Sequence, residues 1–174
     1  IVSKLEYDSQ PMNIETIQVV PFARGIVADY LNTGIDVQYD LEFFDTPTVQ
    51  ECAIQGDERL LRRAVRNLID NAMRHNGEGC KIALSLDVEP SSMLALTVAD
   101  NGRGCDTSRI GALMAQASTP DASYDAHGLG LTLVSRISIM HGGYVSFASE
   151  PGRGFTATMR IPIAIRQDEP PRAK

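Results

Sequence analysis

Several features that mark membrane, nucleic-acid-binding or metal-binding proteins are missing from this sequence. No apolar run approaches the ~20 residues that span a bilayer, and residues 1–10 do not resemble a secretory signal peptide. Lys and Arg number 16 against 22 Asp and Glu, and the resulting net charge of −6 argues against a nucleic-acid binder. The three cysteines have no metal-ligand spacing, and their odd number is typical of a reduced, cytoplasmic protein.

The composition that remains is that of a folded domain able to bind a nucleotide. Apolar residues make up 43% and charged residues 22% of the 174 residues, which suffices for one domain with its own core. An acidic chain can still bind phosphates, because backbone N–H groups and magnesium hold them. The chain starts with Ile rather than Met, so we interpret it as a fragment and expect any membrane span to lie upstream.

The spacing of apolar residues predicts an α/β domain over residues 11–165. Helices are predicted over 21–32, 57–75, 107–115 and 128–140, and strands over 37–43, 49–54, 80–88, 93–99, 144–147 and 155–163. Leu31 and Ile139 belong to the apolar stripes of the first and last helices. Residues 116–127 are small and polar, which predicts a mobile loop. We expect residues 1–10 to end an upstream helix before Pro11, and residues 166–174 to form a disordered tail.

The predicted helix over 57–75 carries two asparagines on the flank of its apolar stripe. Asp57 is a suitable N-cap, and Asn67, Asn71 and Arg74 follow one another at one-turn spacing along the same edge. An amide oxygen on such a half-buried flank can ligate a hard cation such as magnesium. The alternative is that both amides bond neighbouring backbone groups, which this helix alone would favour.

An Asp-Asn-Gly-Arg-Gly segment follows the apolar strand over 93–99. Asp100 stands at the strand end, where its carboxylate would be partly desolvated. An ionised carboxylate only accepts hydrogen bonds, so it can receive the exocyclic amine of adenine and disfavour guanine, which presents an oxygen there. Taken alone, Asn-Gly is also a common turn, and a simple loop is the alternative.

Two glycine motifs follow. Gly128-Leu129-Gly130-Leu131 lies at a predicted helix start, where glycines let phosphates approach the N-terminal N–H groups. It does not match the dinucleotide fingerprint, which needs a strand immediately before it, or a Walker loop, which needs Gly-Lys-Ser/Thr. Gly152-Arg153-Gly154-Phe155-Thr156 reads by itself as a hairpin turn. Each motif is weak when it is taken alone.

Together and in this order, the four motifs resemble the histidine-kinase branch of the superfamily that includes DNA gyrase, the heat-shock chaperone ATPases and MutL. The resemblance covers about residues 55–163. It implies a two-layer α/β sandwich of the Bergerat type, with a mixed sheet, helices on one face and ATP between a helix pair and a lid. Residues 1–10 resemble the end of the dimerisation helix that precedes this domain in sensor kinases.

The resemblance assigns roles to the residues of these motifs. Asn71 matches the magnesium ligand, Arg74 the basic phosphate contact, and Asn67 the same catalytic asparagine box. His75 flanks the nucleotide, and Asp100 matches the carboxylate that reads adenine. The remaining expected ATP-binding residues are Gly102, Gly104, Gly128, Leu129, Gly130, Leu131 and Thr156.

The chain departs from the family pattern in the lid. Ala126 replaces the usual glycine before the Gly-Leu-Gly, and residues 105–127 contain no Phe, which puts the lid's role in docking in doubt. No phosphoacceptor motif surrounds His75, His127 or His141, and we expect His141 to cap a helix end instead. The acceptor histidine is therefore expected outside this chain. The implied partners are an upstream dimerisation and phosphoacceptor domain and a response-regulator receiver domain, in a homodimeric bacterial sensor whose cytoplasmic part includes this chain.

Three alternatives remain open. An ATP-hydrolysing switch of the gyrase or chaperone kind has a glutamate where this chain has Asn67, and an amide cannot act as a general base for water. A serine kinase resembling anti-sigma factors would share the fold. A non-catalytic pseudokinase is favoured by the altered lid and disfavoured by the presence of Asn71 and Asp100.

Overall fold

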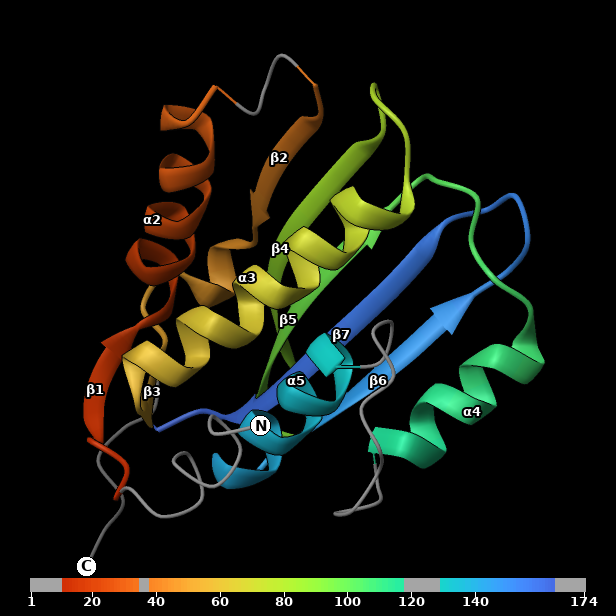
Figure 1. Ribbon diagram of the computed structural model, residues 1–174. Helices are drawn as coiled ribbons and strands as arrows, with labels where there is room; N and C mark the ends of the chain where they lie inside the picture. Colours follow the sequence, from red (N-terminus) through yellow and green to blue (C-terminus); the bar gives the residue numbers. More distant parts are fainter. Residues whose placement is uncertain (1–10, 35–37, 118–128, 165–174) are drawn as a thin grey trace, which may run out of the picture.

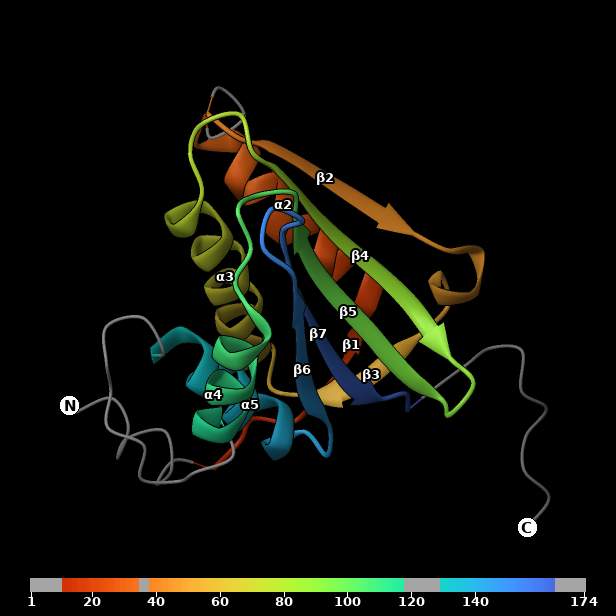
Figure 2. The ribbon, with the colours of Figure 1, turned by 90° about the vertical axis from the view of Figure 1, so that its right-hand side faces the viewer.

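A five-stranded mixed sheet with helices on one face forms the body of the protein (Figures 1 and 2). The computed structural model describes residues 11–34, 38–117 and 129–164. The strands lie in the order β2 (Asp40–Asp45), β4 (Lys81–Glu89), β5 (Met93–Asp100), β7 (Phe155–Pro162) and β6 (Tyr144–Ser149). Strand β2 runs parallel to β4, and the other neighbours are antiparallel. The predicted α/β sandwich is thereby confirmed.

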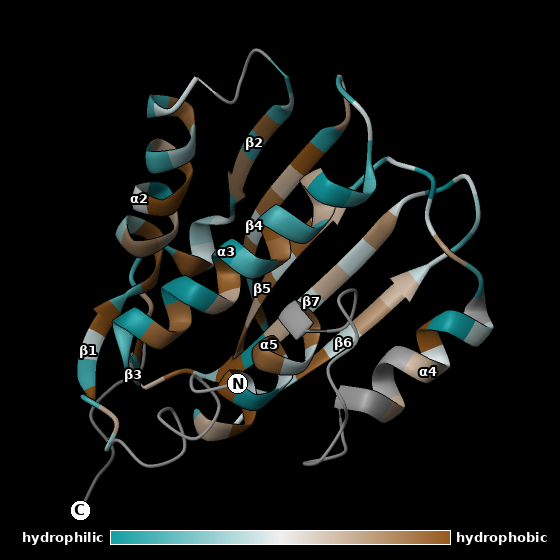
Figure 3. Cartoon of the chain, in the orientation of Figure 1, coloured by the Kyte–Doolittle hydropathy of each residue, from teal (hydrophilic) through white to brown (hydrophobic). Residues whose placement is uncertain are grey.

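Alternation along the strands gives the sheet one buried face. In β4, Ile82, Leu84 and Leu86 are at most 1% exposed, whereas the residues between them are not buried. The cross-strand register places Leu84 beside Val98 of β5, and Val98 beside Ala157 of β7. Hydrophobic residues therefore form continuous rows across the sheet, and Figure 3 shows the apolar colour concentrated on its central strands.

In the described residues, four helices accompany the sheet: α2 (Val19–Asn32), α3 (Glu58–His75), α4 (Thr107–Ala117) and α5 (Leu129–Met140). Helix α3 begins as predicted, because the Asp57 carboxylate accepts a hydrogen bond from the Leu60 N–H at 3.2 Å. Its buried stripe is Leu60, Leu61, Ala64, Val65, Leu68, Ile69 and Ala72. This stripe packs into the core and leaves the asparagine edge half-buried beside it.

A buried histidine joins the end of α5 to the start of α3. The Nε2 atom of His141 accepts a hydrogen bond from the Asp57 backbone N–H at 3.0 Å, and its Nδ1 lies 2.7 Å from the Ile137 carbonyl oxygen. Because a carbonyl oxygen can only accept, Nδ1 carries the proton and the ring is the neutral Nδ1–H tautomer. The predicted helix-end role of His141 is confirmed, with a second bond that the sequence did not indicate.

The N-terminal half contains a small sheet that the sequence did not predict. Strand β1 (Glu15–Gln18) pairs antiparallel with β3 (Ala53–Gly56). The predicted strand over 49–54 is wrong in its first half, because Pro47–Val49 form a single 3₁₀ turn, η2, before β3 begins. In β1 only Ile17 is buried, so the apolar signal was too weak to predict a strand.

The ends and faces of other elements also differ from expectation. Leu31 and Ile139 are 42% and 59% exposed, so their assignment to buried helix stripes is wrong. Helix α4 extends to Ala117, into the expected loop. The predictions for residues 1–10, Val37, the rest of the 116–127 loop, Gly128 and the 166–174 tail lie outside the described residues. No helix in the described ranges has both the length and the apolar character needed to cross a membrane.

Candidate functional site

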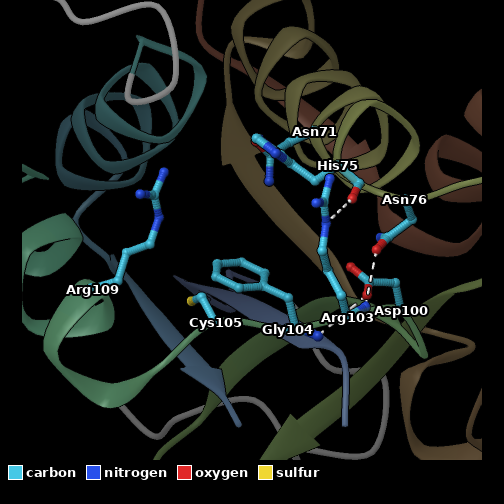
Figure 4. Close-up of a pocket in the computed structure, with 9 residues that line it drawn as sticks. Asn71, His75, Asn76, Asp100, Arg103, Gly104, Cys105 and Arg109 are labelled. Atoms are coloured by element: carbon cyan, nitrogen blue, oxygen red, sulfur yellow. Dashed lines mark hydrogen bonds between the residues drawn. The ribbon is translucent and has the colours of Figure 1, made fainter. Parts of the chain in front are cut away.

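A cavity of about 300 Å³ opens where the C-terminal end of α3 faces the loop after β5 and the first turn of α4 (Figure 4). Its position follows from the fold, since α3 packs on the sheet with its last turn beside the end of β5. The lining residues are Asn71, His75, Asn76, Asp100, Arg103, Gly104, Cys105, Arg109 and Phe155.

Asp100, the last residue of β5, lines this cavity with a carboxylate of which one oxygen is hydrogen-bonded within the described residues. Its Oδ1 accepts hydrogen bonds from the backbone N–H groups of Gly102 at 2.9 Å and Phe155 at 3.3 Å. No donor from the described residues bonds Oδ2. The residue therefore fixes the surrounding loops with one oxygen and leaves the other as an acceptor for a ligand amine.

The cysteine next to this end of the sheet does not add charge to the site. Burial raises the pKa of the Cys80 thiol, and the nearby Asp100 carboxylate raises it further. The Cys80 Sγ lies 3.3 Å from the Asn101 Oδ1 and donates to it. Cys80 thus remains a neutral thiol, and Asp100 provides the negative charge at this end of the cavity.

The loop after Asp100 needs its glycines because other groups occupy the space of a side chain. A Cβ on Gly102 would lie 1.8 Å from the Asn76 Oδ1. Gly104 has a φ of +64°, and a Cβ there would lie 2.1 Å from the Glu150 carbonyl oxygen. The Asp-x-Gly-x-Gly spacing is therefore explained by close approach to the end of α3 on one side and to the β6–β7 turn on the other.

Two residues that the sequence analysis did not select tie this loop to α3. The Asn76 side chain donates to the Ala72 carbonyl oxygen at 2.8 Å and accepts from the Arg103 backbone N–H at 3.2 Å. The Arg103 Nε donates to the His75 carbonyl oxygen at 2.8 Å, so a cation lies at the negative end of the α3 dipole. An asparagine after a helix is a capping signal that could have indicated Asn76. No local sequence signal indicated a role for Arg103.

The structure brings several of the predicted residues together. Asn71, His75, Asp100 and Gly104 line the cavity, and Gly102 lies in the same loop. Arg74 is exposed and is not among the described lining residues, and Asn67 is half-buried one turn earlier in α3.

The described glycine-box residues and Thr156 are not among the described lining residues of this cavity. Leu129 and Gly130 begin α5, and Leu131 is buried in the core at 4% exposure. Thr156 pairs with Ala99 beside Asp100 in the sheet register. Gly128 lies outside the described residues.

Three further lining residues, Cys105, Arg109 and Phe155, were also missed. The Cys105 N–H donates to the Ser149 Oγ at 2.8 Å, and the Phe155 ring packs 5.8 Å from that of Phe147. The bond of Cys105 joins residues 44 apart in the sequence, so local spacing does not reveal it.

The side chains that line the cavity suit a metal ion that binds together with a second ligand. In the described ranges, no group of three or more His, Cys, Asp or Glu side chains could hold a metal ion. The Asn71 side chain supplies one amide oxygen at the cavity wall. Magnesium commonly takes one or two protein oxygens and completes its shell with phosphates and water, so such a site fits it.

A mixed α/β sandwich with an acceptor carboxylate and an asparagine amide in one cavity is compatible with a nucleotide-binding domain. Residues 56–165 match the family described as histidine kinase-, DNA gyrase B- and HSP90-like ATPase, and the chain belongs to this family. It is an ATP-binding catalytic domain of the kind found in sensor histidine kinases.

Similar proteins agree with this assignment. The chain is 28% identical over 160 residues to the sensor histidine kinase YvrG of Bacillus subtilis, covering 90% of this chain and 27% of that protein. It is 36% identical over 141 residues to the sensor protein BasS of Escherichia coli, covering 81% of this chain and 37% of that protein. The chain thus spans about a third of the length of these relatives.

The fold also matches a solved structure. Full-length ShkA, in a complex with AMPPNP, superposes with a TM-score of 0.74 and 21% identity, covering 90% of this chain and 32% of that chain. The resemblance to histidine kinases and the two-layer α/β prediction are both confirmed.

Proposed function

We propose that this domain binds magnesium–ATP in the cavity below α3 and positions the γ-phosphoryl group for transfer to a histidine outside the chain. The observation that carries the proposal is that Asp100 and Asn71, the expected adenine reader and magnesium ligand, line one cavity. The relatives are sensor kinases, and the structural neighbour ShkA binds AMPPNP, an analogue of ATP.

Each residue would contact a different part of the nucleotide. The Asp100 Oδ2 would accept the adenine amine, with Gly102 and Gly104 keeping the loop close enough for that contact. His75 would flank the base or ribose. The Asn71 amide oxygen would hold magnesium, which supplies charge neutralisation on the phosphates when bound.

The phosphate end of the site would come from the start of α5 and its neighbours. Gly128 and Gly130 would offer backbone N–H groups to the phosphates, with Leu129 beside them and the buried Leu131 anchoring that turn in the core. Thr156 would support the site from β7. Asn67 and Arg74 belong to the proposed catalytic edge of α3, and Arg74 would have to turn toward the phosphates, since it is exposed.

The two histidines of the described residues are unsuited to accept the phosphoryl group. His75 lines the nucleotide cavity, and His141 is buried with both ring nitrogens bonded, so neither is a suitable acceptor. An acceptor histidine would be supplied by a dimerisation domain of a homodimeric sensor, which then passes the phosphoryl group to a response-regulator receiver domain. The chain would lie on the cytoplasmic side of any membrane anchor.

A phosphotransfer assay tests this function. The chain is incubated with magnesium, ATP labelled at the γ-phosphate, and the histidine-bearing dimerisation domain added separately. We expect label on that domain that is stable in alkali and lost in acid, because phosphohistidine has these properties. Acid-stable label would contradict histidine transfer and favour a serine kinase, and an absence of label with ATP bound would favour a pseudokinase.

A further inference from the structure

The wall of the cavity formed by α4 carries an arginine to which none of the motifs assigns a function. Arg109 lies in the first turn of α4 and lines the cavity, and Figure 4 shows it across the cavity from Asn71 and His75. Arg109 belongs to α4, whereas the residues of the asparagine box belong to α3. Arg109 therefore places a positive charge on the α4 wall of the cavity.

The guanidinium of Arg109 has no ion-pair partner among the described residues. The nearest carboxylate by sequence, Asp106, uses its Oδ1 to accept from the Ser108 hydroxyl and from the Arg109 backbone N–H at 3.0 Å. These hydrogen bonds lower the pKa of Asp106, and the charge of Arg109 contributes least to that lowering. Asp106 therefore caps the helix and leaves the guanidinium free to meet a ligand.

The Asp106 carboxylate offsets the helix dipole at the start of α4, but it does not pair directly with the guanidinium of Arg109. The first turn of a helix is its positive end, where acidic side chains are stabilised and cations are not. The first turn of α4 contains no acidic residue, yet it contains Arg109.

The other cavity arginine is already engaged. The Nε of Arg103 donates to the His75 carbonyl oxygen, which anchors that side chain at the C-terminal end of α3. Arg109 has no such anchor in the described part of the chain. It is thus the arginine on the cavity wall that can reorient onto a polyphosphate at little cost.

We propose that Arg109 contacts the γ-phosphate of ATP and determines the preference of this site for triphosphates over shorter nucleotides. The inference rests on the ATP binding proposed above and adds a residue of α4 to the site. A bidentate guanidinium contact would neutralise phosphate charge from the side opposite the Asn71-bound cation.

A ligand series separates contact with the phosphates from contact with the base. Arg109→Ala and Arg109→Glu are compared with the original chain for binding of ATP, ADP, AMP and adenosine in magnesium, by calorimetry. Arg24→Ala is the matched control, because it removes an exposed arginine of α2 that lies outside the cavity.

We expect Arg109→Ala to weaken ATP binding at least about tenfold, and to leave the binding of ADP, AMP and adenosine unchanged. Arg109→Glu should weaken ATP more than Arg109→Ala does, while Arg24→Ala should match the original chain. An equal loss for adenosine and ATP, or unchanged ATP binding, would overturn the role of Arg109. Failure of the original chain to bind any of the four ligands would instead overturn the proposed function itself.

Discussion

Asp100 shows how a single side chain serves both the fold and the ligand. Its Oδ1 accepts two backbone hydrogen bonds, which hold the loop after β5 and the start of β7 together. Its Oδ2 remains an acceptor at the cavity wall. A substitution that keeps the first function and removes the second would isolate the contribution of the acceptor to nucleotide recognition.

Asp100→Asn is that substitution. The asparagine keeps an oxygen for the Gly102 and Phe155 N–H groups, and places an NH₂ donor where Oδ2 was. Two donors would then meet at the adenine amine, so we expect ATP binding to weaken at least about tenfold, or ~1.4 kcal/mol. Binding of GTP should gain relative to ATP, because guanine offers an oxygen at that position.

Calorimetric titration with ATP and GTP measures this change, and circular dichroism verifies that the fold is intact. Equal ATP affinities for the variant and the original chain would show that Asp100 does not read the base.

Some site residues were predictable from the sequence because local signals mark them. Asp100 follows an apolar strand and Asn71 lies on the flank of a helix stripe, so both could be selected before the fold was known. Arg103 and Arg109 could not, because an arginine in a loop or an exposed helix turn is ordinary. Only the packing of α4 and of the 100–104 loop against α3 and the sheet gives them a shared cavity.

At the scale of elements, α3 is the part of the fold that has to be held in place. His141 bonds the backbone at its start, Tyr30 of α2 bonds its middle, and Arg103 bonds its last turn. The residues of the proposed asparagine box lie between these attachments. Loosening an attachment should therefore lower stability first, and nucleotide affinity as a consequence.

The attachment at the start of α3 can be tested with His141→Ala. The change leaves the buried Asp57 N–H without its acceptor and opens a cavity beside Gly56, where the ring now lies in van der Waals contact. We expect a loss of about 2–4 kcal/mol in the free energy of unfolding, measured by urea denaturation.

His141→Gln should lose less, because its amide oxygen can still accept from the Asp57 N–H. If alanine costs under ~0.5 kcal/mol, a value typical of surface positions, the bond between α5 and α3 has no structural importance.

The attachment in the middle of α3 depends on a protonated phenol. Burial raises the pKa of Tyr30 well above its ordinary value, and donation of the hydroxyl to Asp70 Oδ1 at 2.6 Å raises it further. We expect Tyr30→Phe to cost about 1 kcal/mol at pH 7, measured by urea denaturation.

The pH dependence gives a second observable for Tyr30. Because the folded pKa lies above the unfolded value of about 10, the contribution is complete below pH ~10 and is lost as pH rises through the folded pKa. The Phe variant lacks this group, so its deficit relative to the original chain should shrink in alkali. A deficit that stays constant up to pH 11 would contradict this account of Tyr30.

Elements were predictable where their signals are long and local. The 18-residue α3 has a clear apolar stripe and a capping aspartate, and the β4–β5 hairpin alternates over most of its length. Strand β1 has four residues, of which Ile17 alone is buried, and its partner β3 lies almost forty residues later. Its existence depends on long-range pairing, which periodicity does not record.

At the scale of the whole molecule, the asparagine box of α3 carries amides where a hydrolytic switch has a glutamate base. Asn67 and Asn71 are amides, and amides do not accept protons at neutral pH. We therefore expect steady-state ATP hydrolysis by the chain alone to lie far below ~1 per second, an ordinary enzyme rate. A phosphate-release assay measures it, and turnover near that rate would favour a hydrolytic switch over a phosphotransferase.

The proposed function requires ATP to bind in the cavity between α3, the 100–104 loop and α4. A crystal structure of the chain with magnesium and AMPPNP tests this most directly. We predict the adenine amine on the Asp100 Oδ2, magnesium on the Asn71 amide oxygen, and the phosphates extending toward Arg109 and the start of α5. Nucleotide bound with its adenine away from Asp100, or outside this cavity, would contradict the account.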